Sequence, residues 1–233
     1  MSGRRKLLIF SCFVLIDALL LGGIILLREV TLKNVLNKEV SALAELDLFK
    51  DRYNSKIESH GDYALVEEAI KSYLDDYALE IQKVAEARLD TKLNSLTLVS
   101  NIEKDGPYFD KSLEYIDKYQ NEFNEHCEVL ASYLEENNIN DYIYQYTDDK
   151  ELVKMYRKLL KDNKIKEKLA ESERALVINR IDTNSHIDAI RGVITFLKDN
   201  NGNYYIEDGE VKFNNTQLFA EYVKLFDKTK RIY

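Results

Sequence analysis

The stretch FDKSLEYIDKYQNEFNEHCEVLASYL, residues 109–134, decides the fold class of this chain. One set of its residues recurs at alternating steps of four and three: Phe109, Leu113, Ile116, Gln120, Phe123, Cys127, Leu130 and Leu134. This heptad-like spacing puts these side chains on one side of a helix that packs against other helices. The stretch therefore predicts a mainly α protein, an antiparallel bundle of long helices with Cys127 in the core.

The helical spacing extends to both sides, because the chain has only eight Gly and one Pro in 233 residues. Gly61 is expected to end a first helix and Asp62 to cap a second, while Asp148 and Glu151 form a capping-box pattern before a fourth. The predicted helices run from the N-terminal apolar residues to about Ile57, from Asp62 to about Val99, from Pro107 to Leu134, and from Asp148 to about Lys198.

The period changes near the C-terminus. NYYIEDGEVKF, residues 203–213, alternates around Asp208 and Gly209, which is the strongest short signal for a hairpin. We expect strands at residues 203–207 and 210–213, followed by a last helix capped by Asn214 or Asn215. Its apolar side would carry Leu218, Phe219, Tyr222, Val223 and Phe226.

The N-terminus carries an apolar run of 21 residues, from Leu7 to Leu27, after a basic segment that contains Arg4, Arg5 and Lys6. At about 1.5 Å per residue it can span a hydrocarbon core of roughly 30 Å. It is longer than the apolar part of a cleaved signal peptide and lacks a small-residue cleavage site. We therefore expect a transmembrane anchor that continues into the bundle.

Asp17 lies near the middle of this run. The run holds 15 Leu, Ile, Phe and Val residues, whose insertion energy outweighs the cost of one central carboxyl. Ser11, Ala18 and Gly22 share a helical stripe that permits close approach of another helix. Asp17 and this stripe are either a membrane assembly face or, in the simpler interpretation, a polar residue that the surrounding leucines tolerate.

Topology and domain limits follow from the anchor. Residues 1–6 are expected in the cytoplasm, 7–28 in the plasma membrane, 29–200 as an extracytoplasmic bundle, and 201–233 as a hairpin and helix that cover one end. The formal net charge of −8 disfavours a nucleic-acid partner and weakens the idea that the domain lies flat on anionic lipid. The expected partners are the bilayer and a protein, which is either a different protein or a second copy of this chain.

Two polar segments leave alternatives open. The linker predicted at residues 137–149 carries Tyr142, Tyr144 and Tyr146, which either grip a ligand or partner or cap the end of the bundle. The middle of the predicted fourth helix is unusually polar, with Glu173, Arg180 and Thr183 at seam spacing. This middle part is either a buried polar layer that fixes register or a stretch exposed to solvent.

Catalytic and metal motifs are not found in the sequence. No phosphate-binding loop, nucleophile elbow or two-cysteine metal knuckle occurs, and His60, His126 and His186 are expected on three different helices. Glu122 and His126 form one possible metal edge. A calcium loop matches five positions but has Tyr204 where Gly is required; these positions are Asp199, Asn201, Asn203, Glu207 and Glu210.

We therefore expect no catalytic residues, no cofactor and no metal. The favoured function is a membrane-anchored, non-enzymatic interaction or scaffold module outside the cytoplasm. The alternative is a ligand-binding or sensory ectodomain coupled to another membrane subunit, although only about six residues would lie in the cytoplasm to return a signal.

Overall fold

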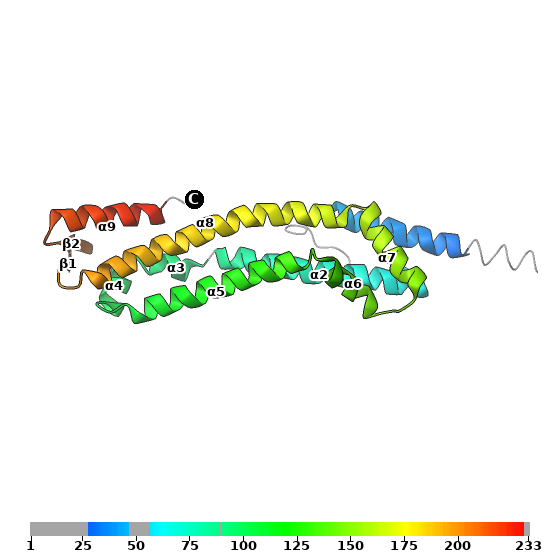
Figure 1. Cartoon of the computed structure of the whole chain (residues 1–233), viewed down its shortest axis with the longest axis horizontal. Coiled ribbons are helices and arrows are strands. Elements are labelled where there is room, and N and C mark those ends of the chain that lie inside the picture. The colour runs from blue at the N-terminus through cyan, green and yellow to red at the C-terminus, as the bar shows by residue number, and fades with distance from the viewer. Residues whose placement is uncertain (1–27, 47–55, 89, 231–233) are drawn as a thin grey trace, which may run out of the picture. The chain divides into compact units, whose positions relative to one another are not determined.

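The computed structural model describes residues 28–46, 56–88 and 90–230. These residues are mainly helical and end in an antiparallel hairpin followed by a terminal helix (Figure 1). The chain forms two compact units. Unit 1 consists of the described residues up to Asp75 together with Glu136–Lys168, and unit 2 consists of Asp76–Glu135 together with the described residues from Leu169 onward.

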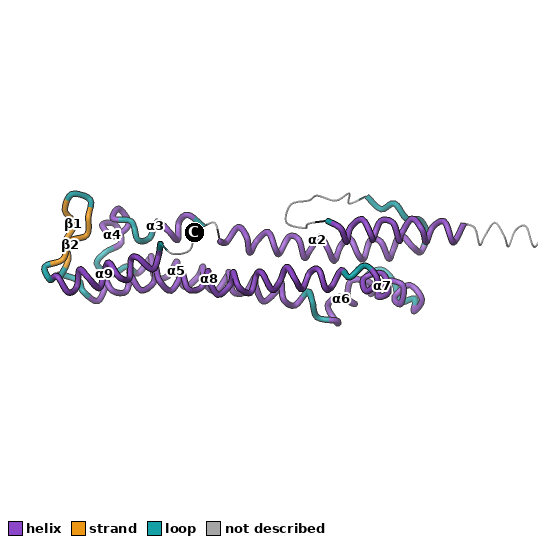
Figure 2. Tube along the Cα trace, turned by 90° about the horizontal axis from the view of Figure 1, so that it is seen from above, coloured by secondary structure: helices purple, strands orange, loops and turns teal. Residues whose placement is uncertain are grey.

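Figures 1 and 2 show the elements along the chain. They are a helix at residues 28–45, α2 (Asp62–Arg88), α3 (Thr91–Ser95), α4 (Val99–Asp105), α5 (Asp110–Ser132), α6 (Glu136–Tyr144), α7 (Lys150–Asp162), α8 (Ile165–Asp199), β1 (Tyr204–Glu207), β2 (Glu210–Phe213) and α9 (Thr216–Thr229).

The first predicted helix is too long at its C-terminal end. The helix ends at residue 45, and residues 57–60, which include His60, are not helical. The backbone N–H groups of Glu58 and Ser59 donate instead to the carboxylate of Glu67, at 3.0 and 2.7 Å. This side chain on α2 satisfies the two amides, and Gly61 then turns the chain with a φ of 63° into α2, whose first residue is Asp62.

The second and third predicted helices are also divided differently. Helix α2 ends at Arg88, and Asp90 caps α3 by accepting from the N–H groups of Lys92 and Leu93. A separate helix, α4, follows. Pro107 is not in the first turn of α5, which begins at Asp110 after Phe109 adopts a φ of 55°.

The predicted linker at residues 137–149 is wrong, because Glu136–Tyr144 form α6. The fourth predicted helix is two helices. Helix α7 is capped by Asp149 rather than Asp148, and it ends where the Asn163 side chain donates to the Leu159 carbonyl at 2.9 Å. Lys164 then adopts a φ of 52° before α8.

The C-terminal prediction is confirmed. Strands β1 and β2 pair antiparallel with Glu207 opposite Glu210, and Asp208 and Gly209 both have positive φ, as a type I′ turn requires. Asn215 caps α9 by accepting from the Gln217 N–H at 2.7 Å. Of the expected apolar side of α9, Phe219 and Val223 are largely exposed.

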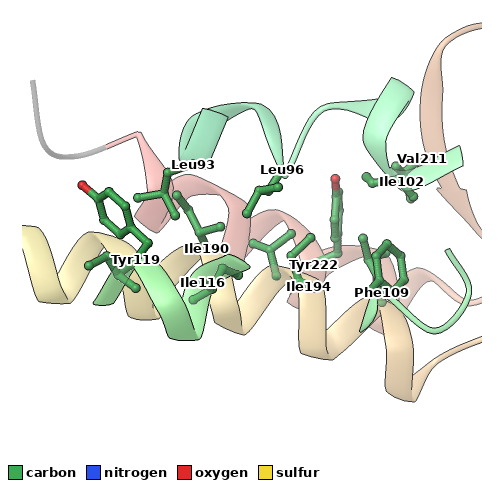
Figure 3. Packing of buried hydrophobic residues seen from close by; sticks show 13 residues of the cluster. Leu93, Leu96, Ile102, Phe109, Ile116, Tyr119, Ile190, Ile194, Val211 and Tyr222 are labelled. Carbon is green, nitrogen blue, oxygen red and sulfur yellow. The ribbon is translucent and has the colours of Figure 1, made fainter. Parts of the chain in front are cut away.

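The core of unit 2 lies around α5 and α8, which run antiparallel (Figure 3). Helices α3 and α4, the hairpin and α9 complete it. The buried residues are Leu93, Leu96, Ile102, Phe109, Ile116, Tyr119, Ile187, Ile190, Val193, Ile194, Leu197, Val211 and Tyr222. Cys127 is only half-buried and does not belong to this cluster.

None of the helices in the described ranges is long and apolar enough to cross a membrane. The predicted anchor at residues 7–27 lies outside the described residues, and so do the four predicted assembly residues Ser11, Asp17, Ala18 and Gly22.

Candidate functional site

A groove in unit 1 is lined partly by apolar and partly by charged side chains. Four buried side chains, from Tyr73, Ile139, Leu160 and Ile165, make the apolar part, and the groove has a volume of about 310 Å³. Exposed charged residues also line it: Arg157, Lys161, Lys166, Glu136 and Glu167. This arrangement can receive an apolar group and hold an anion beside it.

Helices α6 and α7 form this groove because two neighbouring side chains of α7 reach α6. The buried Tyr156 hydroxyl donates to the Ile139 carbonyl at 2.8 Å, and burial raises the pKa of Tyr156. The next residue, Arg157, donates from Nε to Asn140 Oδ1 at 2.8 Å and from Nη2 to the Tyr144 hydroxyl at 3.3 Å. These contacts fix the cation at the edge of the apolar lining.

The three candidate tyrosines have different environments. Tyr142 packs edge-on against Tyr73, with ring centroids 5.3 Å apart, and the Tyr146 hydroxyl lies 2.8 Å from Ser72 Oγ. These two side chains attach the α6 region to α2 within unit 1. Tyr144 is 48% exposed and contacts Arg157 at the groove.

A buried ion pair lies elsewhere in unit 1. Glu67 is fully buried and accepts from Lys71 Nζ at 2.7 Å as well as from the two backbone N–H groups described above. Lys71 also donates to the Lys56 carbonyl at 2.6 Å. Burial raises the pKa of the Glu67 carboxyl, but these hydrogen bonds outweigh burial, so that the pKa is lowered from its ordinary value of 4.5. The pair is a structural clamp that holds residues 56–59 against α2.

The polar middle of α8 is a connected network in unit 2. Asn184 Nδ2 donates to Asn124 Oδ1 at 3.0 Å, and its Oδ1 accepts from Gln120 Nε2 at 3.0 Å. Arg180 Nε donates to Asn124 Oδ1 at 2.9 Å. Thr183 is buried. The network joins α8 to α5, which favours the register-fixing interpretation of this segment over free exposure to solvent.

The histidines and Cys127 do not form a reactive cluster among the described residues. His126 Nδ1 lies 2.5 Å from Glu80 on α2, within unit 2, and this is its partner rather than Glu122. Burial raises the pKa of the Cys127 thiol, which keeps it protonated and weakly nucleophilic. No group of three or more His, Cys, Asp or Glu residues suited to a metal ion occurs in the described part of the chain.

The five positions of the possible calcium loop also depart from that geometry. Asp199 ends α8, Glu207 ends β1 and Glu210 begins β2, the strand that pairs with β1. A calcium loop of this type leads into a helix, whereas here the chain turns into β2.

No family model matches the chain, and neither a curated protein nor a solved structure is significantly similar to it.

Sequence reasoning missed the groove, because it assigned α6 to a linker and did not divide α7 from α8. One signal was present. Residues 150–168 contain eight Lys or Arg and only three Asp or Glu, in a chain whose net charge is −8.

Proposed function

We propose that this chain is a non-enzymatic interaction or scaffold module, held by a single N-terminal span in the plasma membrane with its helical domain outside the cytoplasm. In this proposal the anchor helix continues into residues 28–45 and so into unit 1. The long apolar run after a basic N-terminus supports the topology.

The groove of unit 1 is the observation that carries the proposal. Its apolar lining is buried, and its cations Arg157, Lys161 and Lys166 have no ion-pair partner among the described residues. A protein segment that places apolar side chains against this lining and offers carboxylates at its edge would cover the groove and pair these cations. Binding of this kind needs no catalytic group.

Site-specific photo-crosslinking of the full-length chain in membranes tests this function. A photoreactive residue in place of Lys161 or Lys166 should give the same protein adduct, and the added change Arg157→Glu should reduce its yield. The exposed Lys111 of unit 2 is the matched control position, where this adduct should not form. Without an adduct at either groove position, or with equal yield at Lys111, the groove is not the interaction site.

The topology has its own test. A cysteine placed at Ser132, with Cys127 replaced, should react with a membrane-impermeant thiol reagent on intact cells. Reaction only after lysis would reverse the orientation.

The intramembrane contribution is tested at Asp17. If Asp17, Ala18 and Gly22 form an assembly face, Asp17→Leu should leave insertion intact and weaken co-purification of the partner in mild detergent, by roughly the 0.6 to 2 kcal/mol of membrane polar contacts. Unchanged complexes in both Asp17→Leu and Gly22→Leu would leave Asp17 as a tolerated polar residue.

One observation favours the alternative of a ligand-binding ectodomain. A volume of about 310 Å³ lies at the lower end of small-molecule sites. A small amphipathic anion would then raise the melting temperature of the wild type more than that of Arg157→Glu, whereas a groove that serves only a protein would show no such shift.

A further inference from the structure

Charge is distributed unevenly between the two units. Over their full sequence ranges, unit 2 (Asp76–Glu135 with Leu169–Tyr233) contains 15 Lys or Arg against 23 Asp or Glu, whereas unit 1 (Met1–Asp75 with Glu136–Lys168) contains 18 of each, with its basic residues concentrated at positions 150–168. A net charge of −8 for the whole chain is therefore compatible with a local cationic surface in unit 1. Unit 2, which carries the whole excess of carboxylates, is unsuited to an anionic partner.

The cations of α7 form a ridge along one side of the helix. Lys150, Lys154, Arg157 and Lys161 recur at steps of four, three and four, and all four side chains are exposed. The opposite side of the helix is buried through Val153, Tyr156, Leu159 and Leu160. The carboxylates of this helix, Glu151 and Asp162, lie off this stripe, so that α7 is a basic amphipathic helix whose apolar side is already used by the fold.

The ridge is also not neutralised by any ion pair among the described residues. None of its four residues forms an ion pair with a carboxylate in the described ranges. By contrast, Arg180, Arg191 and Lys198 of unit 2 each pair with a carboxylate of α5. Surface cations left unpaired in a row remain available to an external anion.

The ridge lies beside the helix that follows the apolar run. Lys33 and Asn37 of the helix at residues 28–45 line a groove of about 300 Å³ together with Lys154 and Lys158 of α7. Lys33 comes five residues after Arg28, which corresponds to about 8 Å along a helix. If residues 7–27 span a membrane, Lys33 lies within about one Debye length of its surface, and the ridge extends away from that end, because Asn163 after α7 accepts from Ser41 at 2.8 Å.

We propose that the cationic ridge of α7, Lys150, Lys154, Arg157 and Lys161, docks on anionic phospholipid headgroups of the membrane that holds the anchor. This inference rests on the proposed anchor. Arg157 and Lys161 also line the groove of unit 1, so a bound protein segment and the headgroups compete for these two cations. Phosphate oxygens of the headgroups pair the four cations, and the docking holds unit 1 against the surface. Each Lys or Arg that reaches an anionic bilayer is worth roughly fivefold in binding.

The full-length chain in nanodiscs tests the docking by energy transfer to a headgroup acceptor. A single cysteine at Met155, with Cys12 and Cys127 replaced by serine, carries the donor beside the ridge. Transfer should be high in discs that contain phosphatidylglycerol, lower in discs of phosphatidylcholine alone, and should fall as salt screens the charges. A donor at Glu221 in unit 2 should show no such lipid dependence.

Charge reversal separates the ridge from cations in general. The variant Lys150→Glu, Lys154→Glu, Arg157→Glu, Lys161→Glu should lose the lipid-dependent transfer, and the milder replacement of the same four residues by Gln should lose most of it with unchanged circular dichroism. Reversal of four exposed cations of unit 2, Lys104, Lys111, Lys224 and Lys228, is the matched control and should leave transfer unchanged.

The outcomes distinguish the two proposals. A chain that alkaline carbonate extracts from membranes refutes the anchor. A carbonate-resistant chain with equal transfer in both lipids, or with transfer unaffected by the ridge variants, refutes the docking and leaves the anchor in place. If the control variant loses as much lipid-dependent energy transfer as the ridge variant, the effect depends on net charge alone, and the docking is also refuted.

Discussion

The two units use polar side chains in opposite ways. In unit 1, Glu67 and Lys71 form a buried ion pair whose side chains also hydrogen-bond to the backbone of three residues in a non-helical segment. The cations of α7 in the same unit are exposed. Unit 2 has one buried carboxylate among its described residues, Glu80, and otherwise spreads its polar contacts along α5 and α8, where half-exposed amides and ion pairs follow one another. Removing one side chain of the buried pair leaves polar groups without water or a hydrogen-bond partner, which costs much stability. In the half-exposed network, water can replace the hydrogen bonds that a substitution removes.

Loss of the clamp carboxylate should have the largest effect. Glu67→Ala removes the nearer carboxylate of the buried Lys71, whose remaining ion pair is with Glu39 at 3.7 Å, and it removes the acceptor of two backbone N–H groups, so unit 1 should lose about 3–5 kcal/mol. Urea unfolding with hydrogen exchange along α2 measures this loss. The neighbouring Glu68 is exposed, and Glu68→Ala should change stability by less than about 0.5 kcal/mol. Similar small losses in both variants would contradict the concentrated clamp.

The clamp also predicts acid sensitivity. Because the pKa of Glu67 is lowered in the folded chain, its contribution is present above the ordinary value of 4.5 and is lost as pH falls through the folded pKa. Measured relative to the intrinsic exchange rate at each pH, hydrogen exchange in α2 should therefore accelerate below about pH 4.5. A Glu67→Gln chain that shows the same acceleration would assign it to other carboxyls.

In unit 2, the hairpin turn should give the next largest effect. Gly209 has a φ of 74°, and a Cβ there would meet no heavy atom within 4 Å. Gly209→Val should thus cost about 1–3 kcal/mol through backbone conformation alone. Thermal unfolding compared with Gly209→Asn, which tolerates positive φ, measures this cost. Equal loss in both variants would mean that the cost is not conformational.

The amide network should give a smaller loss, because it is only half-buried. Asn184→Ala removes contacts to Asn124 and Gln120 and should cost about 1–2 kcal/mol by chemical denaturation. Ser185→Ala on the exposed side of α8 is the control. If Asn184→Ala lowers the free energy of unfolding as much as Glu67→Ala does, the two units do not differ in their dependence on single polar side chains.

The smallest effect is a mild pH dependence of unit 2 at His186. Its Nε2 lies 2.7 Å from Asn94 Oδ1, its Nδ1 has no partner among the described residues, and burial lowers its pKa. The unfolded chain therefore binds the proton first, so that stability is complete above about pH 6.5 and falls as pH drops toward the folded pKa. Melting temperatures between pH 7 and 5 should fall less in His186→Gln, and parallel curves would exclude this histidine.

The hairpin and terminal helix were predictable because their signals are local. Asp208 and Gly209 supply the two positive φ values of the turn, and Asn215 supplies a side-chain acceptor within two residues of the N–H that it caps. The helix breaks were not predictable in the same way. Asp90 caps α3 while it also accepts from Tyr115 on α5, and the apolar period continues across the break.

The candidate site shows the same limit. The excess of Lys and Arg at residues 150–168 is visible in the sequence, but the groove needs Tyr73 of α2 and Ile139 of α6 beside α7. The three tyrosines of α6 and its C-terminal side are visible in the sequence as a candidate site. Only the structure shows that Tyr142 and Tyr146 contact α2.

The sequence by itself determined the helical class, the turn at Asp208 and Gly209, and the concentration of cations near α7, because periodicity, turn conformation and charge are properties of neighbouring residues. Only the tertiary structure decided which charges are buried in pairs, as at Glu67 and Lys71, and which stand unpaired on a ridge. The reason is that desolvation and ion pairing depend on side chains brought together from distant parts of the chain.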